Sequence, residues 1–93
     1  MKKISADTVI KKNEDILVKK IDKEAVLLNL ATGDYFTLNE TLRVIWSLID
    51  GKLTLQEMAL KMVSSYDVGY RRALSDIISL VGKLQKRKLI AID

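Results

Sequence analysis

The side chains that could do chemistry in this sequence are carboxylates and cations, because it contains no histidine and no cysteine. This excludes disulfides, zinc sites built on imidazole or thiolate, and nucleophiles activated by histidine. Three carboxylate pairs could act as acid and base: Asp7 with Asp15, Glu24 with Asp34, and Asp50 with Glu57. All six residues lie in predicted turns or at helix starts, where solvated or capping carboxylates are common. The sequence therefore predicts a protein that is not an enzyme, with no catalytic residue, no metal site and no cofactor.

Two arginines at the start of a predicted helix over residues 70–88 are more informative about function than the carboxylates. Arg71 and Arg72 fall in its first turn, where positive charge opposes the helix dipole at a cost of a few tenths of a kcal/mol each. An acidic partner could compensate them, and so could a nearby Asp67 or Asp76. Both explanations stay open at this stage.

The same helix carries a strip of mostly small residues. Gly82 interrupts it at a cost of about 1 kcal/mol relative to alanine. The glycine either lets the helix pack closely on a sheet or leaves room for another molecule. Helical spacing brings together Arg71, Ser75, Ile78, Ser79 and Gly82. Such a strip could line a groove or could simply pack.

Two more helices are predicted upstream, over residues 39–50 and 54–66. Asn39 is a good N-cap for the first, and Gly51 follows its end. Thr54 and Glu57 form a capping-box pattern at the start of the second. Because the connections are short, the three helices should pack together.

Before the helices, residues 7–38 predict a small antiparallel sheet. Two apolar runs, 25–30 and 35–38, flank a turn at Thr32-Gly33, and β-rich triplets occur at 8–10 and 16–18. Alternation predicts that Phe36 and Leu38 face inward while Tyr35 and Thr37 face away. We expect most of the packing from Val26, Leu28, Leu30, Phe36, Leu38, Ile45 and Trp46. Lysines 11, 12, 19, 20 and 23 either guard exposed strand edges or form a binding patch.

A length of 93 residues fits one domain, over residues 1–93. The predicted elements place it in the α+β class, as a winged helix-turn-helix-like fold with an N-terminal three-stranded antiparallel sheet followed by three helices. A formal charge of +4 permits an acidic partner. The basic start Met1-Lys2-Lys3 is not followed by an apolar signal region, and no apolar run reaches the roughly 18 residues of a membrane span. We expect a cytoplasmic protein without a membrane partner.

At this point the chain resembles the PqqD-like proteins. The resemblance is carried by Val26-Leu-Leu-Asn-Leu-Ala-Thr-Gly-Asp-Tyr-Phe-Thr-Leu-Asn-Glu40, by Ile45-Trp46 and Leu48-Ile49-Asp50-Gly51, and by Tyr66-Asp67-Val68. This family includes the pyrroloquinoline-quinone chaperone and the small recognition proteins of lasso-peptide clusters. Their role is to bind the leader segment of a ribosomally synthesised precursor peptide and present it to a modifying enzyme, such as a radical-SAM enzyme, or to a leader peptidase.

The resemblance also implies a site, in which the leader adds as a strand to the edge at residues 34–38, facing the third helix. The implied peptide-binding residues are Asp34, Tyr35, Phe36, Thr37, Leu38, Arg71, Arg72, Ser75, Ile78, Ser79 and Gly82. Backbone groups of Tyr35, Phe36 and Thr37 would pair with the leader, and Arg71 or Arg72 could pair with an acidic leader residue.

Two alternatives remain at this stage. A winged-helix DNA-binding regulator would use the third helix, but Ser75, Asp76, Ser79 and Gly82 dilute its positive charge, so nucleic acid is the less favoured partner. A structural subunit that stabilises an enzyme without touching its substrate is the other. The precursor, the enzyme and the oligomeric state do not follow from the sequence.

Overall fold

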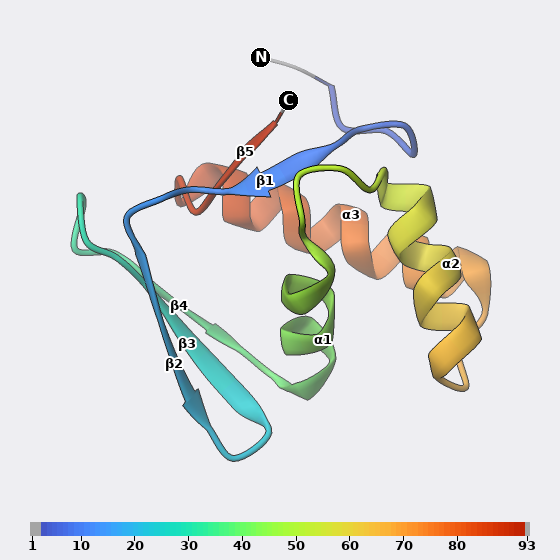
Figure 1. The fold of residues 1–93 in the computed structure, drawn as a ribbon, viewed down its shortest axis with the longest axis horizontal. Coiled ribbons are helices and arrows are strands. Elements are labelled where there is room, and N and C mark those ends of the chain that lie inside the picture. The colour runs from blue at the N-terminus through green and yellow to red at the C-terminus, as the bar shows by residue number, and fades with distance from the viewer. Residues whose placement is uncertain (1–2, 93) are drawn as a thin grey trace.

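The computed structural model describes residues 3–92, so Met1 and Lys2 of the basic start, and Asp93, lie outside the described part. Along the chain the elements are β1 (Ile10–Lys12), β2 (Ile16–Ile21), β3 (Glu24–Asn29), β4 (Tyr35–Leu38), α1 (Glu40–Leu48), α2 (Leu55–Ser65), α3 (Tyr70–Lys86) and β5 (Ile90–Ile92). The antiparallel sheet β2-β3-β4 projects from a body made by the three helices (Figure 1). The α+β, winged-helix-like prediction is confirmed.

The N-terminal strand pairs elsewhere than the sequence suggested. Residues 8–10 were expected to extend the N-terminal sheet, but β1 starts at Ile10 and pairs antiparallel with β5, Ile10 opposite Ile92. The two ends of the chain thus form a separate two-stranded sheet beside the helices (Figure 1). This pairing joins segments about 80 residues apart, and neither segment carries a local turn signal that would reveal it.

The main sheet buries the opposite side of β3 from the one predicted. Ala25, Leu27 and Asn29 are buried, Val26 and Leu28 are half-buried, and Leu30 is 61% exposed. Placing Val26, Leu28 and Leu30 in the core was therefore wrong. One face of this strand carries Ala25, Leu27 and Asn29, and the other carries Val26, Leu28 and Leu30. The second face is the more apolar, and apolar residues usually form the core, so the sequence pattern favoured the wrong face.

The neighbouring strand follows its prediction. Leu38 is fully buried, Phe36 is half-buried against the core, and Tyr35 is 64% exposed. Ile45 and Trp46 of α1 are buried as expected. The inner face of the sheet therefore packs on α1, while Tyr35 and Thr37 present their side chains to the outside.

The predicted helix starts are confirmed in detail. Asn39 Oδ1 accepts the Leu42 N–H at 2.9 Å, and Thr54 and Glu57 complete a capping box. Hydrogen bonds from the Thr54 N–H and hydroxyl hold the pKa of Glu57 below its ordinary value. The Leu53 and Lys52 N–H groups do the same to the pKa of Asp50. Glu57 therefore belongs to the capping box of α2 and Asp50 to the turn between α1 and α2, and neither carboxylate is poised to exchange protons.

Helix α3 completes the core with Ala73, Ile77, Leu80, Val81 and Leu84. The backbone of α3 lies against α2 and β5, whereas β4 packs on β3 and α1. None of the helices within residues 3–92 is both long enough and apolar enough to cross a membrane.

Candidate functional site

The first part of the site is the open edge of β4. The strand order β2-β3-β4 leaves one side of β4 without a neighbouring strand. The Asn29 N–H donates to the Asp34 carbonyl at 2.8 Å, and hydrogen-bonded pairs alternate along an antiparallel ladder. The next hydrogen-bonded pair is therefore Leu27 with Phe36. The backbone groups of Phe36 point into the sheet, and those of Tyr35 and Thr37 point to the open edge.

This register corrects one detail of the predicted site. Tyr35, Phe36 and Thr37 were all expected to offer backbone groups to a peptide, but the N–H and C=O of Phe36 are directed at β3. The expectation assumed that every residue of an edge strand is free. In an antiparallel strand only alternate residues are.

The Tyr35 end of the edge is already occupied by what we call the clasp, formed by Asp34, Tyr35 and Arg87. The Tyr35 N–H donates to Asp34 Oδ1 at 3.0 Å, and Arg87 Nη1 donates to the Tyr35 carbonyl at 3.2 Å. Arg87 Nη1 also lies 3.0 Å from Asp34 Oδ1, and its guanidinium carbon lies 5.8 Å from the centre of the Phe36 ring. Tyr35 and Thr37 are the two β4 residues whose N–H and C=O point to the open edge, and the clasp occupies those of Tyr35. Among residues 3–92, no hydrogen-bond partner is found for the N–H and C=O of Thr37.

Arg87 was missed at the sequence level, because a cation near a helix C-terminus is favoured by the helix dipole and needs no ligand to account for it. It lies 53 positions after Asp34, and nothing in the spacing links the two. The contact arises because the end of α3 is brought beside the start of β4.

Asn29 fixes that arrangement. Its Nδ2 donates to the Lys88 carbonyl at 3.0 Å, and its Oδ1 accepts the N–H groups of Ala31 and Thr32 at 2.9 and 3.3 Å. The Asn13 side chain also donates to the Lys88 carbonyl. This buried amide therefore ties the β3–β4 turn to the segment that follows α3.

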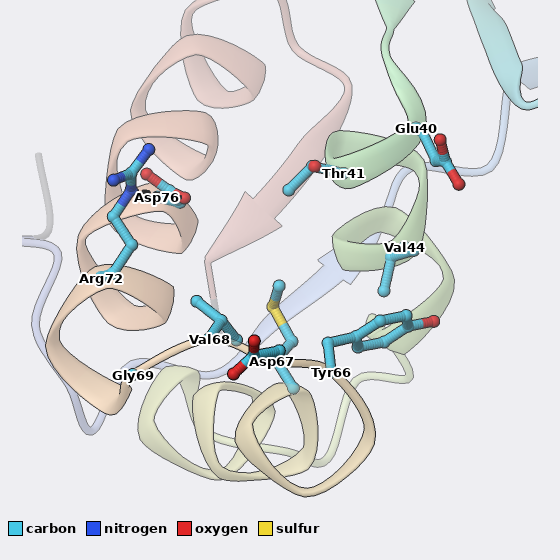
Figure 2. A pocket seen from close by; sticks show the side chains of 10 residues that line it. Glu40, Thr41, Val44, Tyr66, Asp67, Val68, Gly69, Arg72 and Asp76 are labelled. Atoms are coloured by element: carbon cyan, nitrogen blue, oxygen red, sulfur yellow. Dashed lines mark ion pairs between the residues drawn. The ribbon is translucent and has the colours of Figure 1, made fainter.

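The second part of the site is a groove of about 590 Å³ between α1, the end of α2 and the start of α3. It is lined by Glu40, Thr41, Val44, Met62, Tyr66, Asp67, Val68, Gly69, Arg72 and Asp76. Thr41 faces Arg72 and Asp76 across it, Val44 points toward Tyr66, and Glu40 points to the far side of α1 (Figure 2). We call this the α1–α3 groove. Since Thr41 follows Leu38 by three residues and points into this groove, the open edge of β4 leads to it.

The groove combines apolar walls with a mostly acidic rim. Val44, Met62 and Val68 supply the apolar surface, while Asp67 and Asp76 lie at its margin. Arg72 Nε pairs with Asp76 Oδ2 at 3.5 Å, on the exposed surface (Figure 2). The sequence left open whether an acidic partner or a nearby carboxylate offsets the positive charge of Arg72. The structure shows an ion pair with the nearby carboxylate of Asp76.

The predicted residues of α3 divide between two sides of the helix. Helical spacing puts Ser79 on the same stripe as Arg72 and Asp76, and Lys83 and Arg87 continue that stripe toward β4. Arg71, Ser75, Ile78 and Gly82 are not among the residues that line the groove. A Cβ added at Gly82 would meet nothing within 4 Å, so close packing does not account for this glycine.

Comparison with known proteins adds a family match. Residues 24–90 match the family model described as coenzyme PQQ synthesis protein D (PqqD). No curated protein shows significant similarity to the chain.

Solved structures give three informative likenesses. TbiB1 in complex with the TbiA(beta) leader peptide is 29% identical, with a TM-score of 0.76 over 86% of this chain and 93% of that one. Lasso peptide synthetase B1 complexed with the leader peptide is 27% identical, with a TM-score of 0.76 over 88% of this chain and 96% of that one. The heterocyclase TruD shares the fold alone, at 16% identity and a TM-score of 0.63, over 92% of this chain and 12% of that one.

Proposed function

This chain belongs to the PqqD family, and on that premise we propose that it is a non-catalytic protein that binds the leader segment of a ribosomally synthesised precursor peptide. It presents that leader to a modifying enzyme, such as a radical-SAM enzyme, or to a leader peptidase. Such precursors are made in the cytoplasm, which is where we place the protein. The observation that carries the proposal is the unpartnered backbone of Thr37 on the open edge of β4, which leads into the α1–α3 groove.

The proposed binding step is addition of a leader strand to β4. The N–H and C=O of Thr37 form the central pair of hydrogen bonds, which do not depend on the leader side chains. The clasp covers the outward groups of Tyr35, so pairing begins at Thr37 and continues toward α1. Arg87 thus acts as a stop that sets the register of the docked strand.

Selectivity comes from the α1–α3 groove. A leader residue that follows the edge past Leu38 reaches the apolar walls at Val44 and Val68, which suit an aliphatic or aromatic anchor. The rim carboxylates Asp67 and Asp76 favour neutral or basic leader residues beside that anchor. This differs from the acidic leader residue first considered for Arg72, because Asp76 already pairs with that arginine.

A catalytic role has little support in the residues present. The sequence lacks histidine and cysteine, and hydrogen bonds hold the pKa of Asp50, in the α1–α2 turn, and of Glu57, in the capping box of α2, below their ordinary values. No group of three or more metal-ligating side chains gathers within residues 3–92. The DNA-binding alternative is not supported either. A DNA-binding helix presents a cluster of unpaired cations, whereas on α3 Arg72 forms an ion pair with the carboxylate of Asp76.

The test is a titration of the ¹⁵N-labelled protein with the TbiA(beta) leader peptide, followed by amide chemical shifts. We expect saturable shifts at Thr37 and around the α1–α3 groove, with smaller changes at Phe36. A duplex DNA of mixed sequence serves as the comparison, with salt varied in both titrations. Shifts confined to another surface, or tighter and steeply salt-dependent binding of DNA, would reject leader binding at this site.

A further inference from the structure

A second groove, of about 610 Å³, lies on the other side of α1, between that helix and the inner face of the sheet. Val18, Val44 and Trp46 contribute its apolar surface. Its cations come from four separate places in the chain: Lys12 at the end of β1, Lys20 on β2, Lys23 in the β2–β3 turn and Arg43 on α1. Asp22 and Glu40 also line it, so cations outnumber carboxylates two to one. We call it the basic groove.

The cations of the basic groove are not neutralised by ion pairs. The ion pairs found among the described residues join Arg72 to Asp76 and Arg87 to Asp34, both outside this groove. Arg43 Nη1 donates to the backbone carbonyl of Asp22 at 2.8 Å, which leaves the carboxylate of Asp22 unpaired with it. The groove therefore carries an excess of positive charge, which its two carboxylates only partly match.

Lys12 shows the cost of this arrangement. Its ammonium lies 4.9 Å from the centre of the Trp46 ring. Burial, and next the charge of Lys20, lower the pKa of Lys12. An anion entering the groove would counteract both effects, because a nearby opposite charge stabilises the charged form of Lys12.

The backbone beside the basic groove is also open. The Leu30 N–H donates to the Asp15 carbonyl at 2.8 Å, so the odd-numbered residues of β2 pair with β3. Val18 and Lys20 then direct their backbone groups to the free edge of β2, while their side chains line the groove. Extended chain can pair with such an edge, which a free phosphate cannot do.

We propose that the basic groove binds an acidic, extended peptide segment of a partner protein, independently of the leader site. Carboxylates of that segment would meet Lys12, Lys20, Lys23 and Arg43, its apolar side chains would meet Val18 and Val44, and its backbone would pair with the edge of β2. A groove of several hundred Å³ accommodates several side chains and is much larger than one phosphate needs.

The sequence offers a direct probe, because Trp46 is its one tryptophan and Lys12 lies over its ring. The experiment titrates the protein at low ionic strength with an acidic hexapeptide of alternating glutamate and valine and follows Trp46 emission. We expect a saturable change that weakens as salt is added. Lys20→Gln should weaken binding about threefold to fivefold, as expected for the loss of one solvent-exposed ion pair.

The matched control is Lys19→Gln, which removes the same charge from the adjacent residue of β2, whose side chain is not part of the groove. It should leave the affinity within about twofold. Equal weakening by both variants would overturn the site, since diffuse attraction would then explain the binding, and so would no saturable change. Tighter binding of inorganic phosphate or duplex DNA than of the hexapeptide would overturn the assignment to a peptide.

Discussion

Replacing Thr37 by proline tests strand addition with little disturbance of the fold. The Thr37 N–H points to the open edge, so proline removes no bond of the β3–β4 ladder, and proline is tolerated on edge strands with this orientation. We expect the free energy of unfolding to change by less than about 1 kcal/mol. Leader binding should lose one backbone hydrogen bond, about 0.5 to 1.5 kcal/mol net, which corresponds to a roughly twofold to twelvefold rise in Kd.

The assay is fluorescence polarisation with a labelled TbiA(beta) leader peptide, supported by urea denaturation of each variant. Thr37→Val, which keeps the N–H and the shape of the side chain, should bind like the wild type. Phe36→Pro is the opposite control, because its N–H faces β3 and its loss should destabilise the sheet. A folded Thr37→Pro protein with unchanged Kd would refute strand addition at β4, and equal losses for Thr37→Pro and Thr37→Val would assign the effect to the hydroxyl.

Four further changes probe the parts that hold the site. Asn29→Ala should cost about 2 to 4 kcal/mol in urea denaturation, because it deletes hydrogen bonds to three backbone groups at a buried position. Gly82→Ala should stabilise the protein by about 0.5 to 1 kcal/mol by the same measurement, since the added methyl group meets open space. The lowered pKa of Glu57 means that its contribution to stability is complete near neutral pH and is lost as the pH falls below about 4, so Glu57→Gln should flatten the acid decline of the urea midpoint. Arg87→Gln should change stability by less than about 1 kcal/mol, yet tighten leader binding about twofold to tenfold by freeing the Tyr35 carbonyl; weaker binding would mean that Arg87 contacts the peptide.

The sequence was sufficient for the parts of the fold that depend on local chemistry. Asn39, Thr54 and Glu57 mark helix starts because their partners lie within three residues. The pairing of β1 with β5 and the contact of Arg87 with Asp34 depend instead on groups far apart in the chain. Such contacts leave no periodic signal, so local patterns could not predict them.

The buried position of Asn29 shows a different limit. In the run from Ala25 to Leu30, a polar residue such as Asn29 ordinarily marks the solvent side of a strand. The structure buries Asn29 because its amide satisfies three backbone groups at once. Leu30, which was expected in the core, is exposed beside the turn.

The proposed peptide site also bears on how the open edge of β4 avoids pairing with the same edge of another copy. Exposed edge strands invite pairing between copies, and short strands with charged guards reduce that risk. β4 has four residues, and the clasp at Arg87 leaves Thr37 as its unpartnered pairing residue. One residue offers too few hydrogen bonds for stable pairing alone. On the proposed function, a peptide gains useful affinity when it also fills the α1–α3 groove, and edge and groove together would then discriminate a leader from another extended chain.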